Sequence, residues 1–434
     1  MPTGLQSAAL ALPLGLFDKS LGFTCVLETE LSASASQESY CLPSSQSWFA
    51  DASCQTPVAL ASQCSSAPTY VAVQRDCALD SVRQVQPALA SAATVYSWSN
   101  GGCHPRSGTY TVYGLSDPLP MSTFVRVTRT FAGDGRIRAL AYAGEDGSHF
   151  TQPFYSYDSV LDTLCEAGVT SDHGMRCAPL TVAFTRPATF ADSECLHTVA
   201  GISDACAAAQ KFAAGAAVPD ADACTSYATY DMLGAATETV WHEADVCTPG
   251  AAFGDTYGRY AAVSGALPVS ALASFARSTV ALDARLSLYR NSANGQASYA
   301  DYRFYDAMLD GDCNAQRAAD GVVRCLPVDG GLGQVVYTDS LCQSAIYEVD
   351  HVHCTKAPRF AVTAMDDACG GNAVQRVGAA LASAGPIFLK DADGTCESVD
   401  AIPGAVFFAM GEALAASAFA PIITGRLDTN PGGR

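Results

Sequence analysis

Positive charge is scarce in this chain of 434 residues. It has 24 Lys and Arg residues against 43 Asp and Glu, which gives a formal net charge of −19. Proteins bind nucleic acids and anionic lipid surfaces through clusters of basic side chains. The four lysines, Lys19, Lys211, Lys356 and Lys390, form no such cluster. We therefore expect no nucleic-acid partner.

Long apolar runs are also missing. No stretch approaches the roughly 18 apolar residues that a membrane helix requires, so we expect no membrane-spanning segment. The apolar stretch Leu5–Leu16 follows no positive charge and aligns with a strand position of later repeats. We interpret it as part of the fold and not as a signal peptide, so an export signal is absent from this sequence.

Motifs of known catalysis are absent as well. The chain has no Gly-x-Ser-x-Gly elbow, no Gly-rich phosphate loop and no His-Glu-x-x-His. It also lacks the closely spaced cysteine pairs of zinc sites. We expect no catalytic residue, no cofactor and no metal, and we lean against an enzyme.

Cysteines, by contrast, are abundant and evenly distributed. Six fall in each of three repeats, in the same order, which indicates three disulfides per repeat. They are Cys25, Cys41, Cys54, Cys64, Cys77 and Cys103; Cys165, Cys177, Cys195, Cys206, Cys224 and Cys247; and Cys313, Cys325, Cys342, Cys354, Cys369 and Cys396. Disulfides persist in oxidising compartments, so we expect an extracellular, periplasmic or cell-surface protein. Six cysteines allow 15 pairings, and the sequence does not choose among them.

The repeats share a frame of aromatic, aspartate and cysteine residues. An aromatic-Asp-x-x-Leu-x-x-x-Cys segment comes first, then Cys-apolar-Pro, then aromatic-x-Asp-x-x-Cys. The frame recurs after about 145 residues. It predicts three modules over residues 1–132, 133–281 and 282–422, with 423–434 as a C-terminal strand that completes module 1.

Short alternating or aromatic-rich segments predict an all-β fold. The clearest are Thr69–Gln74, Thr109–Tyr113, Arg136–Tyr142, Phe150–Tyr157 and Ala405–Ala409. Hairpin turns are expected at Asp134-Gly135, Asp146-Gly147 and Asp320-Gly321. We expect short antiparallel strands that form about two four-stranded sheets per module.

The two ends of the chain suggest how the modules are arranged. Modules 2 and 3 begin with Gly135-Arg136-Ile137 and Ala284-Arg285-Leu286, whereas module 1 has no such opening. The chain instead ends with Gly425-Arg426-Leu427. A terminal strand that completes module 1 would remove an exposed sheet edge. This favours a closed, β-propeller-like ring; the alternative is three independent β modules in a string.

On these frames the chain resembles a family of cysteine-rich, tandem-repeat, exported proteins of unknown function, found mainly in myxobacteria. The resemblance rests on the Asp-x6-Cys, Asp-Gly-x-x-Arg-Cys-Leu-Pro and Tyr-x-Asp-x-x-Cys frames and covers nearly all of the chain. It implies an exported bacterial protein. It carries no activity that could be transferred to particular residues.

Several polar residues could carry chemistry, and for each we favour a structural interpretation. The repeated aspartates are expected to cap turns through their own backbone; they are Asp18, Asp158 and Asp306, and Asp51, Asp192 and Asp339. His351 and His353 would share a strand face but lack a third metal ligand. His242 and Glu243 would point to opposite strand faces. Asp391, Asp393 and Gly394 resemble part of a calcium loop whose first ligand position falls on Leu389, which cannot bind calcium.

These observations favour an exported structural or binding protein that recognises a protein or glycan without catalysis. The alternative is an extracellular hydrolase that acts on glycans. It would need two carboxylates in a cleft, about 5 Å or about 6.5–9.5 Å apart. The sequence nominates no such pair.

Overall fold

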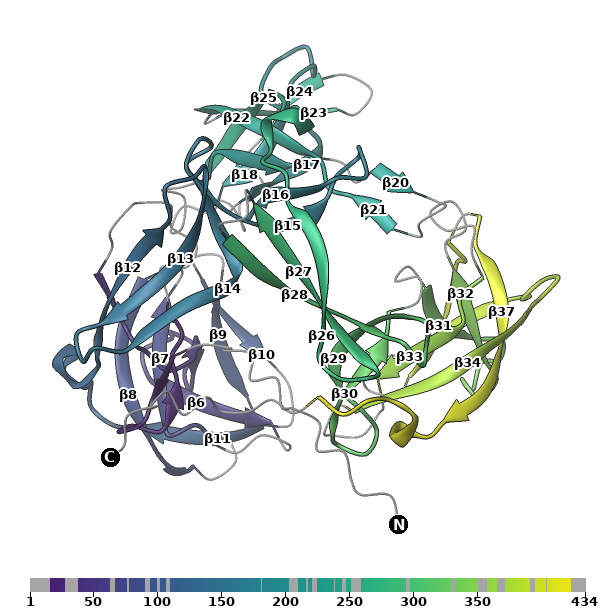
Figure 1. Cartoon of the computed structure of the whole chain (residues 1–434), viewed down its shortest axis with the longest axis horizontal. Helices are drawn as coiled ribbons and strands as arrows, with labels where there is room; N and C mark the ends of the chain where they lie inside the picture. Colours follow the sequence, from purple (N-terminus) through teal and green to yellow (C-terminus); the bar gives the residue numbers. More distant parts are fainter. Residues whose placement is uncertain are drawn as a thin grey trace.

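The computed structural model describes residues 16–27, 38–62, 67–75, 78–89, 94–99, 102–106, 110–180, 182–202, 210–215, 218–220, 225–237, 239–243, 247–250, 259–293, 297–328, 333–349, 357–364, 371–390, 395–402 and 404–422. These residues form strands and three single-turn 3-10 helices, and no α-helix occurs among them. The all-β prediction is confirmed. Figure 1 shows the strands gathered in three lobes, coloured purple to blue, teal, and green to yellow. The module bounds stay a prediction, and module 1, 2 and 3 are used below as names for the three repeats.

The first sheet of modules 2 and 3 is an antiparallel meander, in which each strand pairs with the next along the chain. In module 2 its strands are β13 (Ile137–Gly144), β14 (His149–Asp158), β15 (Thr163–Val169) and β16 (Met175–Pro179), and β12 (Arg126–Ala132), the last strand of module 1, pairs with β13. In module 3 they are β27 (Leu286–Ala293), β28 (Ala297–Asp306), β29 (Gly311–Arg317) and β30 (Val323–Pro327), and β26 (Ala276–Ala281), the last strand of module 2, pairs with β27. In module 1 the corresponding region contains three short strands, β1 (Phe17–Asp18), β2 (Phe23–Thr24) and β3 (Glu38–Tyr40).

The second sheet of each module curls on itself. In module 2 it closes completely, because β17 pairs antiparallel with β18 and parallel with β19. The other pairs in the circuit are β19 with β22, β22 with β25 and β25 with β18. The strands are β17 (Val182–Phe190), β18 (Thr198–Ile202), β19 (Phe212–Ala214), β22 (Tyr230–Thr237) and β25 (Arg259–Ala266), with β20 (Val218–Asp220), β21 (Thr225–Tyr227), β23 (Val240–Glu243) and β24 (Cys247–Gly250) beside them. The result is a small five-stranded barrel.

The corresponding sheets of modules 1 and 3 follow the same order. Module 1 uses β4 (Ser45–Gln46), β5 (Trp48–Phe49), β6 (Pro57–Ser62), β7 (Tyr70–Arg75), β8 (Ala78–Ala88), β9 (Val95–Ser99), β10 (Gly102–Arg106) and β11 (Tyr110–Leu115). Module 3 uses β31 (Gly333–Tyr337), β32 (Ala345–Val349), β33 (Phe360–Ala364), β34 (Asn372–Ala380), β35 (Ile387–Lys390), β36 (Cys396–Val399) and β37 (Val406–Leu414). These sheets have eight and seven strands, larger than the four expected. One reason is that β5 and β31 each also pair with the outer hairpin of their module.

Adjacent modules share sheets and core. Strand β12 pairs on one side with β3 of module 1 and on the other with β13 of module 2. The amide of Phe275 likewise donates to Met175 O before its chain enters β26. Phe275 and Ala293 pack with Ile137 and Cys165 in one cluster that crosses from module 2 to module 3. The contact between modules is therefore apolar and hydrogen-bonded along these boundaries.

The segments that the sequence predicted to be strands are strands in the described structure. All five predicted segments overlap a strand: β7, β11, β13, β14 and β37. Two of the Asp-Gly turns place glycine at positive φ, at Gly147 (85°) and Gly321 (77°). In the third turn the glycine with positive φ is Gly133 (100°), two residues before Gly135. The proposed C-terminal strand, 423–434, lies outside the described residues, so the ring stays a prediction.

Candidate functional site

The first repeated aspartate of each module caps the turn between two meander strands. Asp158 Oδ1 accepts hydrogen bonds from the backbone amides of Val160 (2.9 Å) and Leu161 (3.2 Å). Asp306 Oδ1 does the same for Met308 (2.9 Å) and Leu309 (3.4 Å). Both carboxylate side chains are fully buried. The turn cap that the sequence predicted is present, and its burial requires a further partner for the charge.

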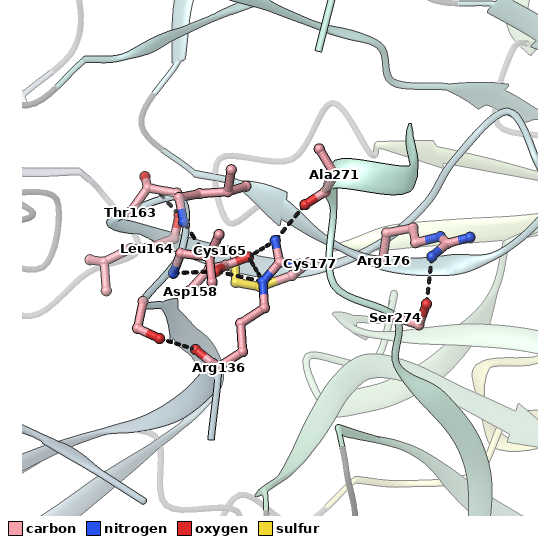
Figure 2. A network of polar contacts seen from close by, with 12 residues as sticks. Arg136, Asp158, Thr163, Leu164, Cys165, Arg176, Cys177, Ala271 and Ser274 are labelled. Carbon is pink, nitrogen blue, oxygen red and sulfur yellow. Dashed lines mark hydrogen bonds and ion pairs between the residues drawn. A yellow bond between two sulfur atoms is a disulfide. The ribbon is translucent and has the colours of Figure 1, made fainter. Parts of the chain in front are cut away.

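An arginine supplies that partner. Figure 2 shows Arg136 between the carboxylate of Asp158 and the backbone carbonyl of Ala271. Its Nε and Nη2 donate to Asp158 at 2.9 and 2.7 Å. The side chain of Arg136 is 28% exposed, whereas that of Asp158 is 0% exposed. A planar guanidinium that spans a carboxylate and a carbonyl fixes the geometry of both.

Module 3 repeats this arrangement, which we call the arginine clamp. Arg285 Nε donates to both oxygens of Asp306 at 2.8 Å, and its Nη2 donates to Ala418 O at 2.7 Å. Ala271 and Ala418 are each the last residue of a 3-10 helix, η3 (Val269–Ala271) and η4 (Ala416–Ala418). The clamp therefore joins the first strand of a module, its aspartate turn and its closing turn.

A second set of charges surrounds the same turn. Tyr157 donates to Asp162, which also accepts from the ammonium group of Lys211. In module 3 Tyr305 donates to Asp310, and Arg359 donates to the carbonyls of Leu309 (2.8 Å) and Asp310 (3.2 Å). Hydrogen bonds from Lys211 and then Tyr157 lower the pKa of Asp162. Burial, with the bond to Asp162 second, raises the pKa of Tyr157 to about 12.

Module 1 keeps the aspartate and loses the partners seen in the other modules. Phe17 takes the place of Tyr157 and Tyr305 and has no hydroxyl. Gly22 takes the place of Asp162 and Asp310, and all three have positive φ, at 77°, 49° and 47°. No arginine precedes Asp18 as Arg136 and Arg285 precede theirs.

The second repeated aspartate of each module caps a tight loop that ends in a disulfide. Asp51 accepts hydrogen bonds from the side chain of Ser53 and the amides of Gln55 and Thr56, which lowers its pKa. Hydrogen bonds from the amides of Ser344, Gln343 and Leu341 lower the pKa of Asp339, although burial acts in the opposite direction. Asp192 follows the same pattern. The cysteine inside each loop has a φ between 51° and 53°. These aspartates hold the backbone of a strained turn, as predicted.

Six disulfides are described, two in each module. The first cysteine pairs with the second, and the third with the sixth: Cys25–Cys41, Cys54–Cys103, Cys165–Cys177, Cys195–Cys247, Cys313–Cys325 and Cys342–Cys396. The fourth and fifth cysteines lie outside the described residues. The Cys165–Cys177 bridge lies beside the clamp of module 2 (Figure 2).

A groove of about 590 Å³ lies next to the clamp of module 3. We call it the module 3 groove. Its apolar lining includes Met308, Leu309, Pro358, Phe360, Val377 and Leu414. The guanidinium groups of Arg359 and Arg376 also line it and lie 5.5 and 6.0 Å from the ring centre of Phe360. Met308 is 75% exposed, and Arg376 pairs with Glu412 at 3.2 Å on the surface.

Of the other residues singled out from the sequence, His242 and Glu243 fall within the described part of the chain, on β23. His351, His353, Asp391, Asp393 and Gly394 lie outside the described residues. Within the described part of the chain, no group of three His, Cys, Asp or Glu side chains could hold a metal ion. No helix in that part is long and apolar enough to cross a membrane.

Comparison with family models matches residues 13–419 to a family of unknown function, DUF7481. The chain belongs to the DUF7481 family. The expectation of an uncharacterised family is thereby confirmed. No curated protein and no solved structure matches the chain, so this DUF7481 member must be interpreted from its own geometry.

The sequence reasoning missed the clamps and the groove of this DUF7481 member. Arg136 and Arg285 were singled out only as markers of a strand. A signal was present, because the modules with an opening arginine are the ones whose turns carry Tyr157 and Asp162, or Tyr305 and Asp310. The groove gave no local signal, since Met308, Phe360 and Arg376 are far apart in sequence.

Proposed function

We propose that the protein is an exported, non-catalytic binding protein of a bacterial cell surface or extracellular space. Its ligand is a protein segment that docks an apolar side chain and a carboxylate in the module 3 groove. The disulfides support an oxidising location, because such bonds persist there. The groove itself is the observation that carries the proposal.

The chemistry of the groove selects the ligand. Met308, at 75% exposed, offers apolar surface that a partner can cover. Arg359 and Arg376, the latter paired with Glu412, place positive charge beside it, on a chain whose net charge is −19. Such a local reversal of charge attracts and orients an acidic partner. Phe360 is only 6% exposed, so it offers no ring face for a sugar to stack on. A protein ligand therefore fits better than a glycan.

The hydrolase alternative finds little support. No carboxylate is among the residues that line the groove. Every described carboxyl group whose pKa is shifted is shifted downward, whereas a glycosidase needs an acid with a raised pKa. Glu348 is fully buried, and its oxygens accept hydrogen bonds from Gln334 (2.7 Å) and the amide of Ile402 (2.8 Å). Its role is accordingly structural.

Selection of a displayed random-peptide library on the immobilised protein tests the proposal. We expect enriched peptides to pair an apolar residue with Asp or Glu. Met308→Asp should weaken their binding by at least about tenfold, because burying a methionine side chain is worth roughly 1.5–3 kcal/mol. Val160→Asp is the matched control, since Val160 occupies the same turn position in module 2, is 69% exposed and lies outside the groove.

Three results would contradict the proposal. Enriched peptides could bind the Met308→Asp and Val160→Asp variants equally well, which would place the site elsewhere. A glycan array could give ligands that Met308→Asp abolishes while the peptide library gives none. Release of reducing ends from polysaccharides by the wild-type protein would indicate the hydrolase instead.

A further inference from the structure

Arg75 of module 1 lies among aromatic rings without a partner for its charge. Its guanidinium carbon is 5.3 Å from the ring centre of Phe49 and 5.7 Å from that of Trp98. Its Nε is buried and has no hydrogen-bond partner, and no carboxylate of the described residues pairs with it. A guanidinium atom is rarely buried without an acceptor, because the charge loses its solvation.

A second donor of the same cluster also lacks an acceptor. The indole Nε1 of Trp98 is buried and has no hydrogen-bond partner, although a buried indole N–H usually finds one. Trp98 packs in the cluster that contains Phe49, Val71 and Val73, and the guanidinium of Arg75 lies against its ring. Two neighbouring donors without an acceptor point to a ligand that carries one.

The other modules show that the fold requires neither donor. Arg75 lies five residues after the aromatic residue of the repeated Cys-x-x-Ala-x-x-aromatic segment, and Trp98 lies two residues after the aromatic residue that pairs with the strand of the second aspartate frame. The corresponding positions hold Ala217 and Glu243 in module 2, and Met365 and Lys390 in module 3. The arginine and tryptophan therefore belong to module 1 alone, and the other two modules form their sheets without them.

Paired strands and a disulfide hold the two side chains in place. Arg75 is the last residue of β7, and Trp98 lies on β9. Trp98 pairs with Cys103 of β10, and Cys103 is bonded to Cys54. Tyr96 precedes Trp98 by two residues and so lies on the same face of β9; both are partly buried and pack against the same cluster. The site is therefore preorganised, which lowers the entropic cost of binding.

The chemistry of these side chains selects an anionic sugar. A guanidinium presents a fork of N–H donors that matches a carboxylate. The negative face of the partly buried Trp98 ring attracts the C–H groups on one face of a sugar ring. On a chain with a net charge of −19, an unpaired cation is what lets an anion approach. Arg75 thus supplies charge recognition, and Trp98 and Tyr96 supply the apolar surface.

We propose that Arg75 and Trp98 form a second binding site, on module 1, for a hexuronate unit of an acidic polysaccharide. The sugar carboxylate pairs with the guanidinium of Arg75, and the sugar ring lies against Trp98 and Tyr96. This site is separate from the module 3 groove: β7 and β9 belong to the purple-blue lobe in Figure 1, whereas β33, β34 and β37 belong to the green-yellow one. The protein then joins an acidic glycan to a protein partner.

Isothermal titration calorimetry of the full-length protein with glucuronate tests the proposal. Glucose is the matched ligand, because it carries a hydroxymethyl group in place of the carboxylate. We expect glucose to bind at least about tenfold more weakly, and Arg75→Gln to weaken glucuronate binding by at least about tenfold, since charge-assisted hydrogen bonds are lost in both cases. Arg106→Gln is the control. Arg106 is exposed on β10, donates to Ser97 Oγ at 2.9 Å, and lies on the opposite face of the hairpin from Trp98.

Three results would overturn the proposal. Glucuronate could fail to bind or bind no more tightly than glucose. Arg75→Gln could bind glucuronate as tightly as Arg106→Gln does, which would place the sugar elsewhere. An oligoglutamate peptide could bind through Arg75 while glucuronate does not, which would assign the site to a protein ligand. If Arg75→Gln fails to fold, Arg75→Lys replaces it. Lysine keeps the charge but not the fork, so its affinity for glucuronate should be reduced; an affinity equal to that of the wild type would contradict recognition by the guanidinium.

Discussion

The arginine clamp of module 3 should be a large local contribution to stability, and Arg285→Met tests it. Methionine keeps the apolar length of the side chain and removes the donors. Asp306, whose side chain is 0% exposed, then retains only the amides of Met308 and Leu309. Removing one partner of a buried ion pair costs about 3–5 kcal/mol. Arg285 is 21% exposed, so we expect the lower end, about 3 kcal/mol.

The reciprocal change should cost less. Asp306→Asn keeps an acceptor for the amide of Met308 and removes the buried charge. Arg285 is left partly exposed, where water can solvate it. We therefore expect a loss of about 1–2 kcal/mol. The order of the two variants, with the arginine change worse, follows from the difference in burial between the partners.

Chemical denaturation followed by far-UV circular dichroism measures both variants. Arg376→Met is the control, because its pair with Glu412 is exposed, at 58% and 73% for the two side chains, and such pairs contribute about 0–1 kcal/mol. In a thermal melt, 3 kcal/mol corresponds to about 3 °C if the whole chain unfolds at once, and to about 10 °C if module 3 unfolds alone. The reasoning is refuted if Arg285→Met costs no more than Arg376→Met.

Three further outcomes are expected. A thiol assay on denatured, unreduced protein should find no free thiol, with the six cysteines outside the described residues forming one bridge per module. Hydrogen bonds lower the pKa of Asp51 and Asp339. These two carboxylates therefore stabilise the fold above the ordinary pKa of 3.8, and that stabilisation is lost as the pH falls below it. The denaturation midpoint should stay constant down to about pH 4 and then drop, and the drop should be smaller in Asp51→Asn. Gly22→Val should destabilise the protein by about 1–3 kcal/mol because φ is +77° there; Gly22→Asp should cost less, as Asp162 occupies the same turn position at positive φ.

Much of the fold could be predicted because its signals are local. Alternation placed β13 and β14, and the aspartate three residues before a leucine predicted a capped turn at Asp158. The arginine clamp could not be predicted, because Arg136 and Asp158 meet only through the strand register that pairs Ile137 with Asp158.

The closure of the module 2 barrel could not be predicted from the sequence for a related reason. The parallel pairing of β17 with β19 joins two strands that are separated by β18 and a long connection. No local pattern distinguishes a curled sheet from two flat ones. The module 3 groove likewise depends on where Met308, Arg359 and Arg376 come together, which is a property of the packed module and not of any one segment.

The aspartate turns of modules 2 and 3 are each locked by an arginine of the same module. The account's central prediction is a closed ring, in which the C-terminal segment completes module 1. Deletion of residues 423–434 tests it most directly, with deletion of 428–434 as the control that keeps Arg426. Hydrogen exchange across the whole chain is the measurement. The account predicts that only the longer deletion loosens residues 16–27 of module 1. Exchange that rises in module 3 alone, with module 1 unchanged, would contradict it.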